Sequence, residues 1–205
     1  MLGDILLIKV QHQELASKIL KIIKKLLKEK QRVSIAISGE SGTGKSELAH
    51  IVRTKLKQEK INSKIIHTDS YYKTLPEERR EWRKKNKDKI GLNEYNWELI
   101  NEHIDAFADK SQEVKLEFVD IVTKQVDKLL TNFAEIEVLI LEGLYAIKAN
   151  VDYRFFIESS EQIKKEAQFK RGKEAFDEFR LEILKKEEQA VNSIIKLADK
   201  KLMCG

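Results

Sequence analysis

The sequence predicts an α/β protein in which helices cover both faces of a central parallel sheet. Short, nearly continuous apolar runs of strand length alternate with longer amphipathic stretches of helical length. The chain has only one proline and eight glycines, so few irregular stretches are expected. Strands that alternate with helices form parallel sheets in three layers. The expected strands are 32–38, 63–67, 137–141 and 152–157, and a weaker one is 114–119.

The first expected helix spans residues 11–30. Its apolar positions recur at helical spacing, with lysines between them: Leu15, Ile19, Ile22, Ile23, Leu26 and Leu27. This pattern favours a helix packed on the body of the protein, although a basic amphipathic helix can also lie on a membrane surface. We therefore expect residues 1–31 to be a helical extension packed on a core domain of residues 32–205.

The remaining helices follow from periodicity and from start and stop signals. Residues 47–57 form a helix directly after a glycine-rich loop, and Pro76 begins another that Gly91 ends. Asn96 is placed to cap a helix over 97–108. We also expect a helix over 121–133, and helices from 160 to about 201 that break near Gly172.

Length and composition limit the class of protein to which the chain can belong. A chain of 205 residues suits one domain with its own hydrophobic core, and 41% apolar with 36% charged residues describes a globular protein. The net charge of +5 is concentrated between Lys73 and Lys89. No zinc-ligand spacing or aromatic sheet pattern accompanies this excess, so a nucleic-acid partner is not expected. A basic segment can equally attract a polyphosphate.

Two terminal features concern location. Cys204 is the only cysteine and cannot form a disulfide within the chain, which favours a reducing compartment. The apolar run near the N-terminus is short, contains Asp4 and lacks a basic leader, unlike a signal peptide or a membrane span. We expect a cytoplasmic protein with no membrane partner, and a homo-oligomer is left open.

The strongest motif is Gly39-Glu40-Ser41-Gly42-Thr43-Gly44-Lys45-Ser46, which matches the phosphate-binding pattern G-x-x-x-x-G-K-S. Small residues let backbone N–H groups close around phosphate oxygens, and the following helix adds its positive end. Lys45 is expected to reach the β- and γ-phosphates of ATP, and the Ser46 hydroxyl to bind Mg²⁺. A chance glycine turn would not have a strand before it and a helix after it.

Two carboxylates follow neighbouring strands. Glu142 ends the strand 137–141, where it can serve Mg²⁺, or can be a capping or solvated glutamate. Asp69 follows the strand 63–67, where it can take a proton from a substrate hydroxyl, or can form an Asx turn or helix cap. Carboxyl ends of parallel strands meet at one edge of a sheet, so both side chains are expected near the phosphate loop.

The phosphate loop, Asp69-Ser70-Tyr71-Tyr72 and Leu141-Glu142-Gly143-Leu144 together resemble the uridine kinase/phosphoribulokinase family. Members carry a loop beginning Gly-x-Ser-Gly, an Asp-x-Phe/Tyr-Tyr segment and a Glu-Gly-Ile/Leu segment. The resemblance covers roughly residues 33–198. It implies a three-layer P-loop kinase fold with a helical lid at about 160–180 and an acceptor-binding insertion at about 73–133. It also implies a Mg²⁺- and ATP-dependent kinase, with Asp69 as general base.

The acceptor-reading segments depart from the family pattern. Uridine kinases carry Asp-His-Pro-Asp-Ala-Phe-Asp where this chain has residues 90–96, so only the aromatic Tyr95 survives. The Pro-x-Tyr-Asp segment corresponds to residues 117–120 and retains only Asp120. Among lid arginines, Arg171 is the best candidate for clamping the transferring phosphate and Arg180 a weaker one.

Side chains near these segments allow two interpretations each. The aromatic residues Tyr71, Tyr72, Trp82, Tyr95 and Trp97 can stack on a planar substrate or pack short helices together. The basic stretch 79–89 can bind an anionic substrate or form a solvated helix face. His67 and His103 lack metal-ligand partners in the sequence and are expected to be structural or surface residues.

Three functional hypotheses follow. The leading one is a kinase that phosphorylates a hydroxyl group of a small molecule, using Lys45, Asp69 and Arg171 as catalytic residues and Tyr72, Tyr95 and Asp120 as weaker substrate contacts. The second is a nucleotide-binding regulatory protein derived from such a kinase. The third is a nucleic-acid end kinase, which only the basic stretch supports.

Overall fold

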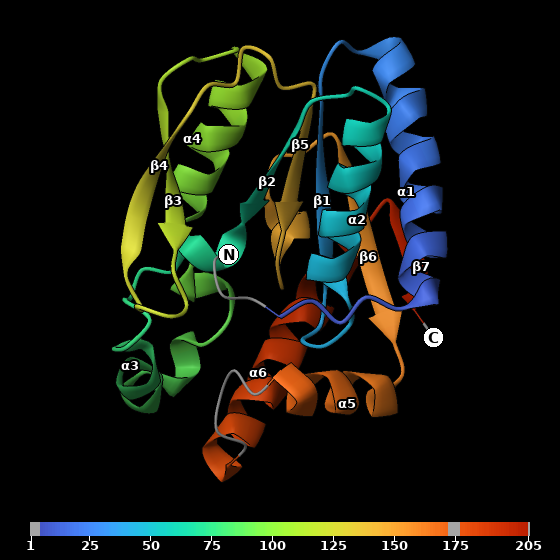
Figure 1. The fold of residues 1–205 in the computed structure, drawn as a ribbon. Helices are drawn as coiled ribbons and strands as arrows, with labels where there is room; N and C mark the ends of the chain where they lie inside the picture. The colour runs from blue at the N-terminus through green and yellow to red at the C-terminus, as the bar shows by residue number, and fades with distance from the viewer. Residues whose placement is uncertain (1–4, 172–176, 205) are drawn as a thin grey trace.

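The computed structural model describes residues 5–171 and 177–204, without the side chain of Arg171. Among these residues, five parallel strands form a central sheet of order β2-β5-β1-β6-β7. Their bounds are β1 Val33–Gly39, β2 Ser63–His67, β5 Val138–Glu142, β6 Tyr153–Ser159 and β7 Lys200–Cys204. The predicted parallel α/β fold is confirmed (Figure 1).

Helices cover the two faces of this sheet. Helices α1 (Val10–Glu29) and α2 (Lys45–Gln58) lie on one face, and α4 (Trp97–Ala108) with the C-terminal end of α6 (Glu178–Ile194) on the other (Figure 1). Side chains of β1 alternate between the two cores: Ile35 and Ile37 pack with α1 and α2, whereas Ala36 faces the opposite side. A strand with buried side chains on both faces must read as a continuous apolar run, as β1 does.

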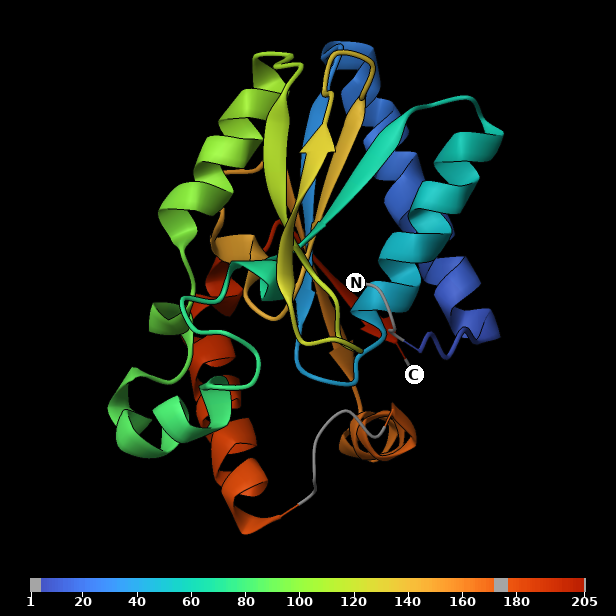
Figure 2. The ribbon, with the colours of Figure 1, turned by 60° about the vertical axis from the view of Figure 1, so that its left-hand side comes forward.

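A long insertion separates β2 from β5. It contains the short helix α3 (Arg79–Lys85), 3₁₀ turns at Lys87–Lys89 and Leu92–Glu94, α4, and an antiparallel hairpin of β3 (Val114–Val119) and β4 (Val126–Thr131). The hairpin stands beside the β2 edge of the sheet (Figure 2). The Asn96 side chain accepts a hydrogen bond from Leu99 N, so the predicted cap of α4 is confirmed.

The helix predicted over residues 121–133 is wrong, because that stretch contains β4. The cause is a tight turn after Asp120, whose Oδ1 accepts hydrogen bonds from Val122 N (2.8 Å) and Thr123 N (3.3 Å). Lys124 then adopts a positive φ of 61°, and the chain returns to pair with β3. A side chain that binds backbone N–H groups two residues ahead favours a turn over a helix.

Helix ends also differ from expectation. The C-terminal helical region does not reach residue 201: α6 ends at Ile194, a 3₁₀ turn follows, and β7 pairs with β6 at the sheet edge. Leu202 and Cys204 are buried there, a pattern too short to identify from sequence. Helix α3 is much shorter than the predicted span from Pro76 to Gly91. Gly172 lies outside the described residues, between α5 (Glu161–Arg171) and α6.

No described helix has the length and apolarity needed to cross a membrane.

Candidate functional site

The glycine-rich loop, residues 39–46, connects the carboxyl end of β1 to the start of α2. Gly42 has a φ of 88°, and a Cβ atom there would lie 2.5 Å from the carbonyl oxygen of Lys164. Only glycine tolerates both the conformation and the close approach. The N-terminus of α2 follows at once and contributes the positive end of its dipole. These features fit the binding of a phosphate chain.

Two side chains of the loop donate hydrogen bonds to the same carbonyl group. Lys45 Nζ donates a hydrogen bond to the carbonyl oxygen of Glu40 (2.8 Å), and Thr43 Oγ1 donates to the same oxygen (2.9 Å). Lys45 is buried, so its ammonium group stays inside the loop and does not extend into solvent. A lysine in this position supplies a cation next to any phosphate that the loop binds.

Glu142 lies beside the start of α2. Ser46 Oγ donates to Glu142 Oε1 (3.2 Å), and His67 Nδ1 lies 2.8 Å from Glu142 Oε2. Strand pairing accounts for the second contact, because His67 of β2 is the register partner of Glu142 in β5. A hydroxyl and a carboxylate side by side are the oxygen ligands that Mg²⁺ prefers. His67 was expected to be structural or surface, and its contact with Glu142 depends on a pairing that the sequence does not reveal.

Among the described residues, no group of three or more His, Cys, Asp and Glu side chains is arranged to hold a metal ion by itself. A Mg²⁺ ion bound through Ser46 and Glu142 would therefore complete its coordination with phosphate oxygens and water, as Mg²⁺ commonly does.

Asp69 lies in a 3₁₀ turn, Thr68–Tyr71, at the carboxyl end of β2. Its side chain is half-buried and makes no hydrogen bond or ion pair with any described residue. Thr68, the residue before Asp69, packs against Gly143, where a Cβ atom would overlap the Oγ1 of Thr68. The segments after β2 and β5 thus lie in contact, which brings Asp69 and Glu142 to the same edge of the sheet.

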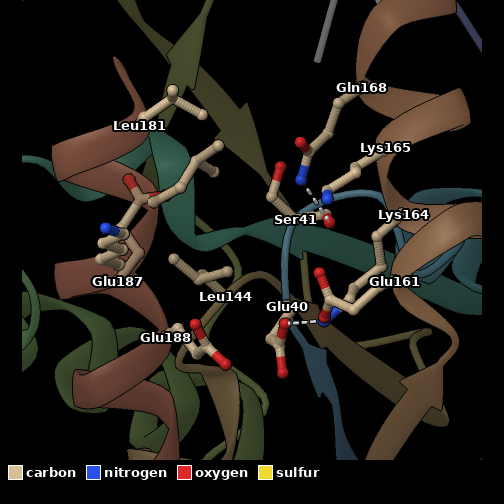
Figure 3. A pocket seen from close by; sticks show the side chains of 12 residues that line it. Glu40, Ser41, Leu144, Glu161, Lys164, Lys165, Gln168, Leu181, Glu187 and Glu188 are labelled. Atoms are coloured by element: carbon tan, nitrogen blue, oxygen red, sulfur yellow. Dashed lines mark hydrogen bonds and ion pairs between the residues drawn. The ribbon is translucent and has the colours of Figure 1, made fainter. Parts of the chain in front are cut away.

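Helix α5 lies across the first half of the loop. The Lys164 ammonium contacts the Glu40 carboxylate, and Gln168 Nε2 donates to the carbonyl oxygen of Ser41 (2.9 Å). A cleft of ≈ 300 Å³ opens between this contact and α6, where Leu181, Glu187 and Glu188 face it (Figure 3). Nothing in the local pattern around Lys164 signals these contacts, and sequence reasoning missed them.

The model of the phosphoribulokinase/uridine kinase family matches residues 34–175, a span that contains the loop, Asp69, Glu142 and α5. The chain belongs to this family. A uridine kinase of Ureaplasma parvum is 30% identical over 137 residues, which cover 63% of this chain and 64% of that protein. The matched region thus spans slightly less than two thirds of this curated relative.

Solved structures of kinases share the fold at low sequence identity. A possible uridine kinase from Bacillus stearothermophilus superposes with a TM-score of 0.64 at 19% identity, covering 92% of this chain and 99% of that one. A D-glycerate 3-kinase from Cryptococcus neoformans gives a TM-score of 0.61 at 12% identity, covering 95% of each chain. These structures establish a P-loop kinase fold, and their names include two different acceptors.

The aromatic residues Tyr72 and Tyr95 pack on one another. Tyr95 is fully buried, with its ring centroid 4.2 Å from that of Tyr72, and its hydroxyl donates to the Tyr72 hydroxyl (2.6 Å). Arg79 stacks on Tyr72, its Cζ lying 3.5 Å from the ring centroid. Burial, and then the nearby Asp69 charge, raise the pKa of Tyr72, so the phenol stays neutral. The cluster therefore packs the insertion together, and Tyr95 offers no surface to a substrate.

A buried ion network joins the insertion to α6. Arg83 binds both carboxylate oxygens of Glu94, at 2.6 Å from Nε and 3.1 Å from Nη2, and its Nη2 lies 3.2 Å from Glu187 Oε1. Glu187 Oε2 lies 3.5 Å from Arg180 Nη1. All but Arg180 are almost completely buried. Arg83, in the basic stretch 79–89, is thus buried in an ion network and is not part of a solvated helix face.

Three further residues were expected at the site: Asp120, Arg171 and Arg180. Asp120 holds the β3–β4 turn through backbone hydrogen bonds. This turn lies at the same end of the molecule as the loop between β1 and α2 (Figure 1). Arg171 is the last residue of α5, and its side chain lies outside the described residues. Arg180 contacts Glu187, which lines the cleft.

The N-terminal segment also contacts the loop and the first turn of α2. Leu7 N donates to Glu47 Oε1 (2.9 Å), and the His12 ring packs against Gly44. His12 Nδ1 accepts a hydrogen bond from Lys9 N (3.0 Å), which leaves Nε2 as the protonated nitrogen of a neutral ring. These contacts were not foreseen, because α1 was expected only to pack on the core.

Proposed function

We propose that this chain is an ATP-dependent kinase that transfers the γ-phosphate to a hydroxyl group of a small molecule. The observation that carries the proposal is the convergence of Lys45, the Ser46–Glu142 pair and Asp69 at the carboxyl edge of three neighbouring strands. A phosphate-binding loop alone requires only that a phosphate binds. A carboxylate that has no hydrogen-bond or ion-pair partner among the described residues, beside such a loop, adds a group able to accept a proton.

Each residue has one role in this proposal. The loop amides and Lys45 bind the phosphate chain, and Ser46 with Glu142 hold Mg²⁺, which neutralises phosphate charge when bound. Asp69 accepts the proton of the acceptor hydroxyl while that oxygen bonds to the γ-phosphorus and ADP leaves. Residues 73–133 serve as the acceptor-binding insertion, and 160–180 as the lid, in which Arg171 offsets charge on the transferring phosphate.

For the acceptor, we propose a chemical class and not an individual compound. Arg79 is half-buried beside Tyr72, and its guanidinium makes no hydrogen bond or ion pair with a described side chain. A guanidinium without a carboxylate partner suits a carboxylate or phosphate on the acceptor. The packed tyrosines, in contrast, offer little to a nucleobase. We therefore favour an anionic hydroxyl compound, phosphorylated in the cytoplasm.

A nucleotide-binding regulatory protein is the second candidate. The burial of Tyr95 and the use of Arg83 in an internal ion network favour it, because both remove side chains from the acceptor side. Such a protein would bind ATP and transfer phosphate to none of the acceptors.

An ATP-consumption screen separates the two candidates. The acceptors should be paired as neutral and anionic partners: nucleosides with nucleoside monophosphates, and sugars with sugar phosphates and sugar acids. Consumption that depends on an acceptor, with a product bearing the new phosphate ester, supports the kinase. ATP binding without turnover on any acceptor supports the regulatory protein.

Asp69→Asn tests the base assignment. The amide cannot accept a proton, so turnover should fall by about 10²- to 10⁴-fold while the Kd for ATP stays within about twofold. Asn96→Asp is a poor control because it alters a cap, whereas Asp105→Asn changes a carboxylate on the outer side of α4 and should leave turnover unchanged. Full activity of Asp69→Asn would show that another group accepts the proton.

A further inference from the structure

The phosphate loop carries an acidic residue. Glu40 directly follows the first glycine of the motif, and its side chain is about one-quarter exposed at the rim of the cleft. A carboxylate beside a bound phosphate chain repels it, and this repulsion is stronger near protein than in bulk water. The Glu40 carbonyl oxygen accepts hydrogen bonds from Lys45 and Thr43, so the main chain of Glu40 is held in the loop and the carboxylate can move only by rotation of its own side chain.

Lys164 is the cation that meets this carboxylate. Its residue is 7% exposed, and its ammonium contacts both Glu40 and Glu161 (Figure 3). Burial alone would lower the pKa of Lys164, but hydrogen bonds to Glu161 and Glu40 outweigh it and raise the pKa above its ordinary value. Lys164 is therefore charged at neutral pH and neutralises Glu40.

The position of Lys164 is set by backbone contacts as well. Its own carbonyl oxygen approaches Gly42 so closely that no side chain fits between them, and Gln168, one turn later, binds Ser41. The first two turns of α5 thus lie along loop residues 40–42. If α5 moved away, the Glu40 carboxylate would lose its cation in the same motion.

We propose that Lys164 is a positioning residue of the nucleotide site: it neutralises Glu40, so that the loop binds a polyphosphate tightly only while α5 is seated on it. The proposal rests on the proposed nucleotide site but not on the identity of the acceptor. It links closure of α5 to affinity for the phosphate chain through one ion pair. In this proposal Lys164 does not contact the phosphates directly, so its role can be distinguished by experiment from that of a phosphate-binding lysine.

A double-mutant cycle on nucleotide affinity tests this. The Kd of the full chain for Mg·ATP and for Mg·ADP is measured by calorimetry for wild type, Lys164→Met, Glu40→Gln and the double variant. Lys164→Met leaves Glu40 charged beside the phosphates and should weaken binding about tenfold or more. Glu40→Gln should bind at least as tightly as wild type. The double variant should recover most of the loss, because no charge remains to be neutralised.

Lys165→Met is the matched control. Lys165 is the exposed neighbour in the same helix and lines the same cleft, so this variant removes one positive charge without touching Glu40. It should change the Kd by less than about threefold, as expected for an exposed charge. Thermal unfolding of each variant shows whether the fold is retained, and Lys164→Arg should keep most of the affinity in a folded protein.

Each outcome bears on a different statement. Rescue in the double variant supports the inference. If the double variant binds as weakly as Lys164→Met, Lys164 acts on the phosphates or on the helix itself, and neutralisation of Glu40 is wrong. If Lys164→Met binds like wild type, the inference fails while the nucleotide site stands. If wild type binds neither nucleotide, the proposed function fails and the inference fails with it.

Discussion

The two halves of the candidate site are built by different means. On the phosphate side, a short run of contiguous residues, with glycine at Gly42 and a buried Lys45, forms the site largely from backbone. On the insertion side, Arg83, Glu94 and Glu187 come from separate elements and are buried against one another. The first half is arranged to meet a ligand, whereas much of the second is already satisfied internally. Substitutions on the phosphate side should therefore affect activity, and those on the insertion side stability.

Of the substitutions that compare the two halves, Lys45→Ala should give the largest effect and should leave the fold nearly intact. It removes the cation expected beside the transferring phosphate, so kcat should fall by about 10³-fold, which corresponds to about 4 kcal/mol of transition-state stabilisation. Steady-state kinetics with the best acceptor and a thermal melt measure the two quantities. Lys57→Ala, on the exposed side of the same helix, should change neither. A large loss of stability in Lys45→Ala would break the contrast between the halves.

Arg83→Met should show the opposite pattern. It leaves Glu94 and Glu187 without their buried guanidinium, and breaking a buried pair in this way costs about 3–5 kcal/mol. We expect about 3 kcal/mol in the free energy of unfolding measured in urea, because Arg180 still lies near Glu187. The Kd for ATP should stay within about threefold. Lys84→Met, whose exposed partner is Glu81, should cost less than about 1 kcal/mol.

The smallest effect concerns pH and His103. This residue is buried in α4 with its Nδ1 2.8 Å from the Tyr71 hydroxyl. Burial lowers its pKa and Lys128 lowers it further, against the opposing charges of Glu117 and Glu102. The unfolded chain therefore binds the proton more readily, so stability should be constant above about pH 6.5 and should fall as the pH drops below it.

The slope of this dependence cannot exceed about 1.4 kcal/mol per pH unit for one proton. His103→Asn should flatten the dependence of the free energy of unfolding on pH between about 7 and 5. The matched change His50→Asn, at an exposed position of α2, should leave the slope as it is. An unchanged slope in His103→Asn would remove His103 from this account.

The phosphate side of the site can be predicted from the sequence, whereas contacts between distant segments cannot. The loop, its flanking strand and helix, and the placement of Asp69 and Glu142 at one sheet edge depend on contiguous residues and on a general rule for parallel sheets. The partners Lys164 of Glu40 and His67 of Glu142 depend on contacts between distant segments. The hairpin strand β4 was mistaken for a helix because its pairing with β3, and not its own periodicity, fixes its form.

The close contact between Gly143 and Thr68 has a consequence for how the site responds to change. Because no atom can be added between these two residues, the strand ends that carry Asp69 and Glu142 cannot come closer together. A displacement that pushes one end toward the other must therefore move both. The smallest separation between the expected proton acceptor and the expected metal ligand is thus set by the Gly143 main chain and the Thr68 side chain, so substitution of the other side chains around them can alter charge at the site more readily than its dimensions.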